Sequence, residues 1–257
     1  MTVAGVDIGS VATKAVVLKN SDILGYAVTP TGADPARAAE TALAGALKQA
    51  SIRHESVQRI MGTGYGRRAT PIADEVITEI TAAAHGARRI CPTGAGTIID
   101  LGGQDTKVIA LDDARIRTFL MNDKCAAGTG KFLEVMAHVL GVSLDTLADM
   151  ALRADAPASL SSTCTVFAES EVISLIHRGA RKETIAAGLH AAIAGRIAAM
   201  VSQVGLNKDV VFIGGGARNR AMHRALQNIL GVNVHVPDNP QFTVATGAAL
   251  IAERHLR

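Results

Sequence analysis

Aromatic residues are scarce in this chain of 257 residues: tryptophan is absent, and aromatic residues make up only 3% of the sequence. Proteins that bind single-stranded nucleic acid stack the bases on aromatic side chains. The net charge is only +3, and the Lys and Arg residues are scattered rather than grouped. Because neither stacking rings nor a basic patch is evident, the composition argues against a nucleic-acid-binding protein.

The chain also lacks an uninterrupted apolar run of about 18 residues, the length that a membrane-spanning helix needs. The nearest candidate, residues 185–204, is broken by His190, Arg196 and Gln203, which predicts a buried or amphipathic helix. Residues 1–9 resemble an apolar strand containing an Asp rather than a secretory signal. We therefore expect a cytoplasmic protein with no membrane partner.

Cysteine is limited to three residues, Cys91, Cys125 and Cys164, and no C-x-x-C pair is present. An odd number of cysteines in a chain that is not exported argues against a disulfide framework. Two of the usual metal sites, a zinc site with C-x-x-C ligands and a cluster with four cysteines from one chain, are also excluded. The cysteines instead indicate thiol, metal or redox chemistry.

What the chain does contain is a repeated motif, D-x-G-x-x-x-T-K, at residues 7–14 and again at 100–107. Apolar runs flank both copies, which predicts a strand, a tight glycine turn and a second strand. Such a turn exposes backbone N–H groups to a phosphate, while Asp can hold a metal ion through water and Lys can meet phosphate charge. One copy alone is typical of an ordinary hairpin. Two copies predict related half-structures that face a polyphosphate from both sides.

The order of elements repeats along with the motif. Three strands and helices fill the first part, and Asp34-Pro35 is a typical helix start. We expect a first lobe at 1–93 and a second at 94–242, with a final helix at about 243–257 packing back on the first lobe. The predicted strands lie near 2–8, 13–19, 22–29, 57–62, 96–101, 105–111, 115–121, 210–213 and 232–236. The predicted helices lie near 34–49, 76–89, 131–140, 143–151, 167–178, 182–204, from about 220 to 230, and 243–255.

Two further glycine motifs need interpretation. Gly214, Gly215 and Gly216 follow the strand at 210–213 and precede a helix, which suits either a tight turn or the adenosine and α-phosphate end of a nucleotide. The G-T-G-K at 128–131 is not a Walker A motif, because Cys125 stands where that motif needs Gly and Phe132 where it needs Ser or Thr.

These motifs resemble, in order, the phosphate-1, phosphate-2 and adenosine motifs of the superfamily that contains actin, sugar kinases and Hsp70-type ATPases. The resemblance implies an α/β, two-lobed actin-like ATPase (ribonuclease H-like) fold with duplicated βββα-type halves that clamp Mg-ATP. It places Asp7 and Asp100 near Mg²⁺ and its waters, and Gln104 beside the attacking water or the γ-phosphate. From the residues alone, the two carboxylates are also compatible with plain turns, and Lys107 with a solvated strand position. The residues expected to bind ATP or ADP are Gly9, Ser10, Val11, Ala12, Thr13, Lys14, Gly102, Gly103, Gly214, Gly215, Gly216 and Asn219.

Cys125 and Cys164 each stand just ahead of a predicted helix, in N-D-K-C-A-A-G-T-G-K and S-S-T-C-T-V-F-A-E-S-E. A helix N-terminus stabilises a thiolate, although two buried structural cysteines would also fit. A symmetric dimer would bring four such thiolates together, the number that a [4Fe-4S] cluster requires.

The segments at 121–136 and 161–174 resemble one branch of the superfamily, the activators of 2-hydroxyacyl-CoA dehydratases, grouped with the ATPase subunits of benzoyl-CoA reductase (BadF/BadG/BcrA/BcrD type). The motifs at 62–67, 100–107, 214–219 and 245–250 resemble the same branch. The resemblance implies a homodimer that shares one [4Fe-4S] cluster between subunits, with Cys125 and Cys164 as its ligands. Cys91 lies outside the matching segments and is expected not to be a ligand.

The function implied by this resemblance is ATP-driven electron delivery. Reduced ferredoxin or flavodoxin would supply an electron, and ATP hydrolysis would pass it at low potential to a 2-hydroxyacyl-CoA dehydratase in an anaerobic cytoplasm. The alternatives are an electron-activating ATPase for benzoyl-CoA reductase or another reductase, a small-molecule kinase of the same superfamily without a cluster, and a nucleotide-sensing module.

Overall fold

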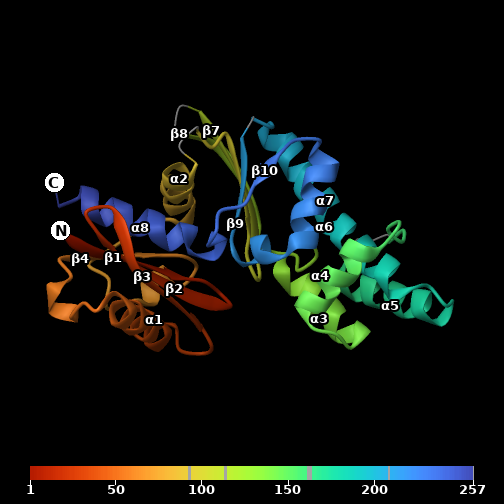
Figure 1. Ribbon diagram of the computed structural model, residues 1–257, viewed down its shortest axis with the longest axis horizontal. Helices are drawn as coiled ribbons and strands as arrows, with labels where there is room; N and C mark the ends of the chain where they lie inside the picture. Colours follow the sequence, from red (N-terminus) through yellow and green to blue (C-terminus); the bar gives the residue numbers. More distant parts are fainter. Residues whose placement is uncertain (92–93, 113–114, 161–163, 208, 257) are drawn as a thin grey trace. The chain divides into compact units, whose positions relative to one another are not determined.

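Strands in the computed structural model form two sheets (Figure 1), and the chain divides into two compact units, one built around each sheet, although the adjoining ends of β7 and β8 are assigned to the first unit. The structure describes residues 1–91, 94–112, 115–160, 164–207 and 209–256. The first unit comprises Met1–Ala95, Leu111–Ile116 and Pro237–Arg257, and the second comprises Gly96–Ala110 and Arg117–Val236. Pro92 and Thr93, in the Pro- and Gly-rich stretch between the predicted lobes, lie outside the described residues.

In the first unit, the sheet has the strand order β3-β2-β1-β4-β5. β1 and β2, and β2 and β3, pair antiparallel, whereas β4 pairs parallel to both β1 and β5. The strands are β1 (Thr2–Ile8), β2 (Ala12–Lys19), β3 (Asp22–Pro30), β4 (Arg59–Thr63) and β5 (Glu75–Val76), and the helices are α1 (Pro35–Ala50), α2 (Glu79–Ile90) and α8 (Thr243–Arg254).

The two faces of β1 are covered by different helices, as the two-residue period of a strand requires. Ala4, Val6 and Ile8 belong to a buried apolar cluster with the inner face of α1. Gly5 points the other way, and a Cβ on it would lie 2.1 Å from the carbonyl oxygen of Ala245 in α8. This alternation places the side chain of Asp7, two residues after Gly5, on the face of the sheet that α8 covers.

In the second unit, the sheet has the order β10-β9-β6-β7-β8. β6 pairs antiparallel to β7 and parallel to β9, and β9 pairs parallel to β10. The strands are β6 (Thr97–Leu101), β7 (Thr106–Asp112), β8 (Arg115–Asn122), β9 (Val210–Ile213) and β10 (Val234–His235), and the helices are α3 (Gly130–Leu140), α4 (Leu144–Arg153), α5 (Thr165–His177), α6 (Lys182–Val204) and α7 (Arg220–Leu230).

The two sheets share one topology, because reading the second order from β8 to β10 reproduces the first from β3 to β5. This arrangement confirms the predicted α/β fold with duplicated halves. The sequence also predicted most elements to within a few residues, and α6 was predicted with its observed bounds. The helix predicted from residue 76 starts instead at Glu79, because Val76 pairs with β4 as part of the short strand β5, which was not predicted.

α6 is the one helix among the described residues that is long and apolar enough by itself to cross a membrane, yet half of its apolar window is buried inside the protein. It contacts α4 and α7, and its buried side chains join the apolar core of the second unit. α6 is therefore best explained as the core helix of a globular unit, as the interrupting polar residues predicted.

Candidate nucleotide site and cysteine pair

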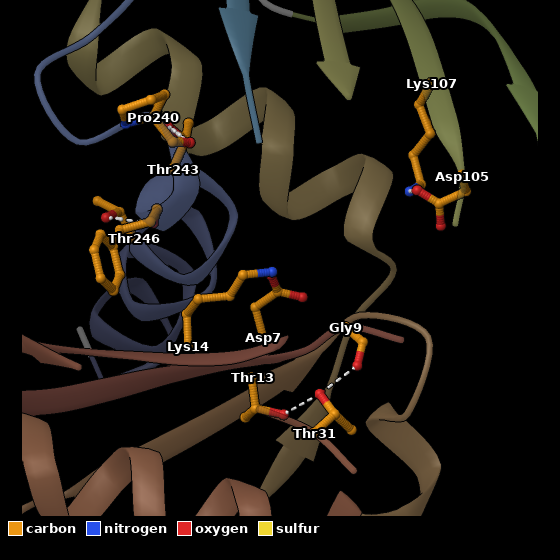
Figure 2. A network of polar contacts seen from close by, with 11 residues as sticks. Asp7, Gly9, Thr13, Lys14, Thr31, Asp105, Lys107, Pro240, Thr243 and Thr246 are labelled. Carbon is orange, nitrogen blue, oxygen red and sulfur yellow. Dashed lines mark hydrogen bonds and ion pairs between the residues drawn. The ribbon is translucent and has the colours of Figure 1, made fainter. Parts of the chain in front are cut away.

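The first copy of the motif forms the tight turn between β1 and β2. The N–H of Gly9 donates to the carbonyl of Ala12 at 3.2 Å. Asp7 and Lys14 are register partners across the two strands, and Lys14 Nζ lies 3.0 Å from Asp7 Oδ2 (Figure 2). Asp7 is buried, with 6% of its surface exposed. The hairpin thus places a carboxylate and an ammonium group side by side next to its turn.

Two threonines brace this turn. Thr31 Oγ1 donates to the carbonyl of Gly9 at 2.7 Å, and Thr13 Oγ1 lies 2.9 Å from Thr31 Oγ1 (Figure 2). A hydroxyl has one hydrogen to donate, and Thr31 gives it to Gly9, so Thr13 must donate to Thr31. Ser10 and Val11 occupy the tip of the hairpin, and Val11 is exposed.

The second copy forms the corresponding turn between β6 and β7. The N–H of Gly102 donates to the carbonyl of Asp105 at 2.9 Å. Lys107 Nζ pairs with Asp105 Oδ1 at 2.7 Å (Figure 2), although its register partner is Asp100. Gln104, at the tip, is exposed. The interpretation of Lys107 as a solvated strand residue is wrong, because only 4% of its surface is exposed.

A glycine turn lies over each of the two motif aspartates. Gly64, after β4, has φ +91°, and a Cβ there would lie 2.5 Å from Asp7 Oδ1. Gly214, after β9, has φ +87°, and a Cβ there would lie 2.4 Å from Asp100 Oδ1. Both positions therefore require glycine for its backbone conformation and for space. The sequence contains both glycine turns, but only the matching strand pairs β1–β4 and β6–β9 show that Gly64 and Gly214 occupy equivalent positions.

Asn219, a predicted nucleotide ligand, caps the helix that follows this second glycine turn. Its Oδ1 accepts the N–H of Met222 at 2.9 Å, and its Nδ2 lies 3.0 Å from Nε2 of His190 on α6. His190 Nδ1 lies 2.7 Å from the carbonyl of Ala186. Because that carbonyl can only accept, Nδ1 carries the proton and Nε2 accepts from Asn219. Both polar atoms of the Asn219 side chain thus have partners within the protein.

His190 is a site residue that the sequence did not single out, since it was noted only as an interruption of an apolar helix. It is 1% exposed. Burial, chiefly, lowers the pKa of His190, and the charge of Arg224 contributes in the same direction. The imidazole is therefore neutral at neutral pH, in agreement with its hydrogen bonds. This neutral ring ties α6 to the start of α7.

Cys125 and Cys164 belong to the second unit, whereas Cys91 ends α2 in the first unit. Cys125 and Cys164 are free and half-buried. Cys164 is the N-cap of α5 and makes no side-chain capping bond, which leaves the helix N-terminus available to a thiolate. Residues 161–163 of its segment lie outside the described residues.

These surroundings fit a cluster that two chains complete. Among the described residues, no three His, Cys, Asp or Glu side chains gather as a metal site, so two thiols are what one chain offers. The hydroxyl of Thr165, next to Cys164, is buried without a hydrogen-bond partner in the described structure. A sulfur-rich group held by Cys164 would give that hydroxyl an acceptor. Cys125 and Cys164 therefore match half of the ligand set of a [4Fe-4S] cluster in residue type and number.

Comparison with known proteins decides the family. Residues 4–252 match the model of the BadF/BadG/BcrA/BcrD ATPase family. The chain belongs to this family. As a BadF/BadG/BcrA/BcrD-type protein it is an ATPase, and the match confirms the resemblance seen in its cysteine and phosphate motifs.

Individual relatives of this ATPase are similar over nearly the whole chain. It is 46% identical to the activator of lactoyl-CoA dehydratase from Anaerotignum propionicum, covering 98% of this chain and 97% of that one. It is 32% identical to a benzoyl-CoA reductase subunit from Thauera aromatica, covering 96% and 91%. The solved activator of 2-hydroxyisocaproyl-CoA dehydratase from Clostridium difficile, with bound ADPNP, matches with a TM-score of 0.93 at 43% identity, covering 99% and 95%.

Proposed function

We propose that this ATPase delivers a low-potential electron to a 2-hydroxyacyl-CoA dehydratase, as a homodimer that shares one [4Fe-4S] cluster in an anaerobic cytoplasm. Reduced ferredoxin or flavodoxin is the proposed donor. The observation that carries the proposal is the pair of free, half-buried thiols in the unit that also holds the second phosphate motif. The similarity to two activators of dehydratases supports the choice of acceptor.

In this proposal, both hairpins serve ATP and Mg²⁺. The buried carboxylates of Asp7 and Asp100 would hold Mg²⁺ through water, a mode of binding that this ion prefers because it dehydrates reluctantly. The turns at Gly9–Lys14 and at Gly102 and Gly103 would face the phosphate oxygens, and the N–H groups that the turns do not use internally would donate to them. Gln104, exposed at its hairpin tip, would orient the attacking water, since its amide both donates and accepts.

The Gly214–Gly216 turn and Asn219 would border the adenosine end. Gly215 has no atom within 4 Å of an added Cβ, so its backbone is open on the side where a side chain would stand. The His190 contact would hold Asn219 as a fixed helix cap rather than as a mobile ligand.

Cys125 and Cys164 of each subunit would hold the cluster, whose chemistry is the reversible storage of one electron. Val166 and Phe167, just after Cys164, are 68% and 69% exposed. Exposed apolar side chains of this size suit a protein interface, and a second subunit that completes the ligand set would cover them.

The test is anaerobic purification followed by iron analysis and size measurement. We expect a brown dimer with about four irons, which Cys125→Ala or Cys164→Ala abolishes. Cys91→Ala is the matched control and should retain the iron, because Cys91 lies in the other unit. A colourless protein after anaerobic iron–sulfur reconstitution would contradict the proposal.

A second candidate acceptor is a benzoyl-CoA reductase, favoured by the 32% identity to a subunit of that enzyme. The reduced protein with ATP should activate a lactoyl-CoA-type dehydratase and should not activate a benzoyl-CoA reductase. Activation of the reductase alone would favour the second candidate. A small-molecule kinase is tested in the same preparation. ATP turnover that depends strictly on an added alcohol would support a kinase, whereas turnover without an acceptor supports the electron-delivering ATPase.

A further inference from the structure

The loop that contains Cys125 is fastened to the second phosphate hairpin by three hydrogen bonds. Thr106 Oγ1 donates to the carbonyl of Gly128 at 2.7 Å. The N–H of Gly130 donates to the carbonyl of Gly102 at 2.9 Å, and the N–H of Lys131 to that of Gly103 at 2.7 Å. The last two donors open α3, where a helix leaves N–H groups without partners of its own. The hairpin thus replaces a side-chain cap, and α3 has none.

The loop itself is closed by short-range bonds. Asn122 Nδ2 donates to the carbonyls of Cys125 at 3.0 Å and Ala127 at 3.2 Å. Thr129 Oγ1 donates to the carbonyl of Ala126 at 2.7 Å. Because Cys125 and Ala127 share one amide donor, the backbone between them cannot shift without breaking a bond. Movement of the backbone at Gly128 would therefore strain the bonds that hold the Cys125 carbonyl.

There is little room for the loop to slip against its neighbours. A Cβ on Gly130 would lie 2.9 Å from the carbonyl oxygen of Gly102, and one on Gly128 would lie 3.1 Å from Cδ of Arg196 on α6. Thr106 itself is fully buried. Its hydroxyl bond to Gly128 is shielded from water, so no solvent molecule can readily replace it.

The first hairpin uses the same motif position differently. Thr13, which corresponds to Thr106, bonds to Thr31, and Thr31 bonds back to Gly9 of the same hairpin. The hydroxyl of Thr13 therefore closes a local loop. The hydroxyl of Thr106 instead reaches the segment that carries Cys125. Thr97, at the end of β6 away from the turn, is equally buried and donates its hydroxyl to the carbonyl of Asn207, which makes it the matched control.

We propose that Thr106 is a positioning residue whose hydroxyl makes the Cys125 loop follow the phosphate hairpin. This inference rests on the proposed function, in which that hairpin binds ATP and Cys125 is a cluster ligand. A phosphate oxygen that accepts from the N–H of Gly103 would displace the peptide whose carbonyl, that of Gly102, holds the first N–H of α3. Thr106 adds the third attachment, next to the loop, and turns that displacement into movement of Cys125.

The test compares the purified anaerobic dimer with saturating ADP and with saturating ADPNP, both with Mg²⁺. The variants are Thr106→Val, which keeps the shape and removes the hydroxyl, Thr106→Ser, which restores it, and the control Thr97→Val. Two quantities are measured: hydrogen exchange of the peptide that contains Gly130 and Lys131, and the rate at which a chelator removes iron.

In the wild type we expect the chelation rates in the two nucleotide states to differ by about fivefold or more, the range of ordinary allosteric coupling. In Thr106→Val, which should still bind ADPNP, the chelation rates in the two nucleotide states should differ by no more than about twofold. Thr106→Ser should restore the wild-type difference between the two rates. Thr97→Val should keep the wild-type ratio. If the valine variant does not fold, Thr106→Ala repeats the test with a smaller side chain that also lacks the hydroxyl.

A Thr106→Val protein that keeps the wild-type ratio and exchange pattern would overturn the inference, as would an equal loss in Thr97→Val. Failure of the proposed function gives a different result. A protein without iron would contradict the cluster, and the nucleotide dependence of exchange at Gly130 and Lys131 would then decide the coupling alone. A protein with iron whose exchange ignores nucleotide in every variant would contradict the coupling and leave the electron-delivery proposal intact.

Discussion

The two motif hairpins have the same motif, strand register and glycine turn, but only the second carries an aspartate within its turn, and its lysine pairs with that aspartate. In the first, Lys14 pairs with Asp7, the register partner at the end of β1. In the second, Lys107 pairs with Asp105, which occupies the position of Ala12 in the first copy. The alanine offers no charge to Lys14, whereas the aspartate, two residues before Lys107, gives that lysine a carboxylate partner within the turn.

The comparison shows that the repeated motif determines the backbone conformation of both turns but does not determine the ion pairs beside them. Both turns close through the same N–H to carbonyl bond, from Gly9 to Ala12 and from Gly102 to Asp105. The side chains diverge where the copies differ, and the second copy gains contacts to the Cys125 loop. We therefore expect substitutions of the shared features to act alike in both units and substitutions of the divergent features to act differently.

The largest expected effect concerns the shared glycines. Gly64→Ala and Gly214→Ala should each destabilise the protein by about 3 kcal/mol or more, because left-handed strain adds to a clash with backbone and a buried carboxylate. Gly141 also has a positive φ, +69°, but nothing lies within 4 Å of an added Cβ. Gly141→Ala should cost only about 1 kcal/mol. Urea unfolding of the three variants checks this, and an equal cost at all three positions would contradict the steric argument.

A smaller effect concerns the first ion pair. Lys14→Met should lower the free energy of unfolding by about 2–3 kcal/mol, because it leaves the Asp7 carboxylate buried without its cation. Adding Asp7→Asn to that variant should recover part of the loss, since the uncompensated charge is then removed. A double-mutant cycle in urea measures this. Strict additivity of the two changes would show that the pair contributes no coupling energy.

The smallest expected effect is pH-dependent and compares two histidines. The pKa of His190 is lowered chiefly by burial, and that of His85 on α2 is lowered by burial and by Arg254 and Arg88. A lowered pKa in the folded state means that the unfolded chain binds the proton more readily. The resulting stability is present above about pH 6.5 and is lost as the pH falls, by at most about 1.4 kcal/mol per pH unit for each group.

His190→Gln should therefore reduce the acid-induced loss of stability between pH 7 and pH 5, and His85→Gln should reduce it less, because His85 is only partly buried. Unfolding curves at several pH values measure both slopes. A slope unchanged by His190→Gln would show that this ring does not take up a proton on unfolding.

Much of the fold could be predicted because its signals are local. Asp34 caps α1 with Pro35 in its first turn, as expected, and the apolar stretch of α6 appeared with its observed bounds. β5 could not be predicted, since two residues carry no periodic signal and Glu75 and Val76 form a strand only by pairing with Met61 and Gly62. For the same reason, the start of α2 was placed too early.

The sequence by itself determined the duplicated hairpins, the ATPase family and the two thiols that we propose as cluster ligands, because each depends on residue type and short spacing. Only the tertiary structure decided which groups the motifs contact. It showed that Gly64 and Gly214 cover equivalent aspartates, that His190 holds Asn219, that Lys107 pairs with Asp105, and that Thr106 reaches the Cys125 loop. These contacts join segments that are distant in sequence, and strand pairing and helix packing bring them together.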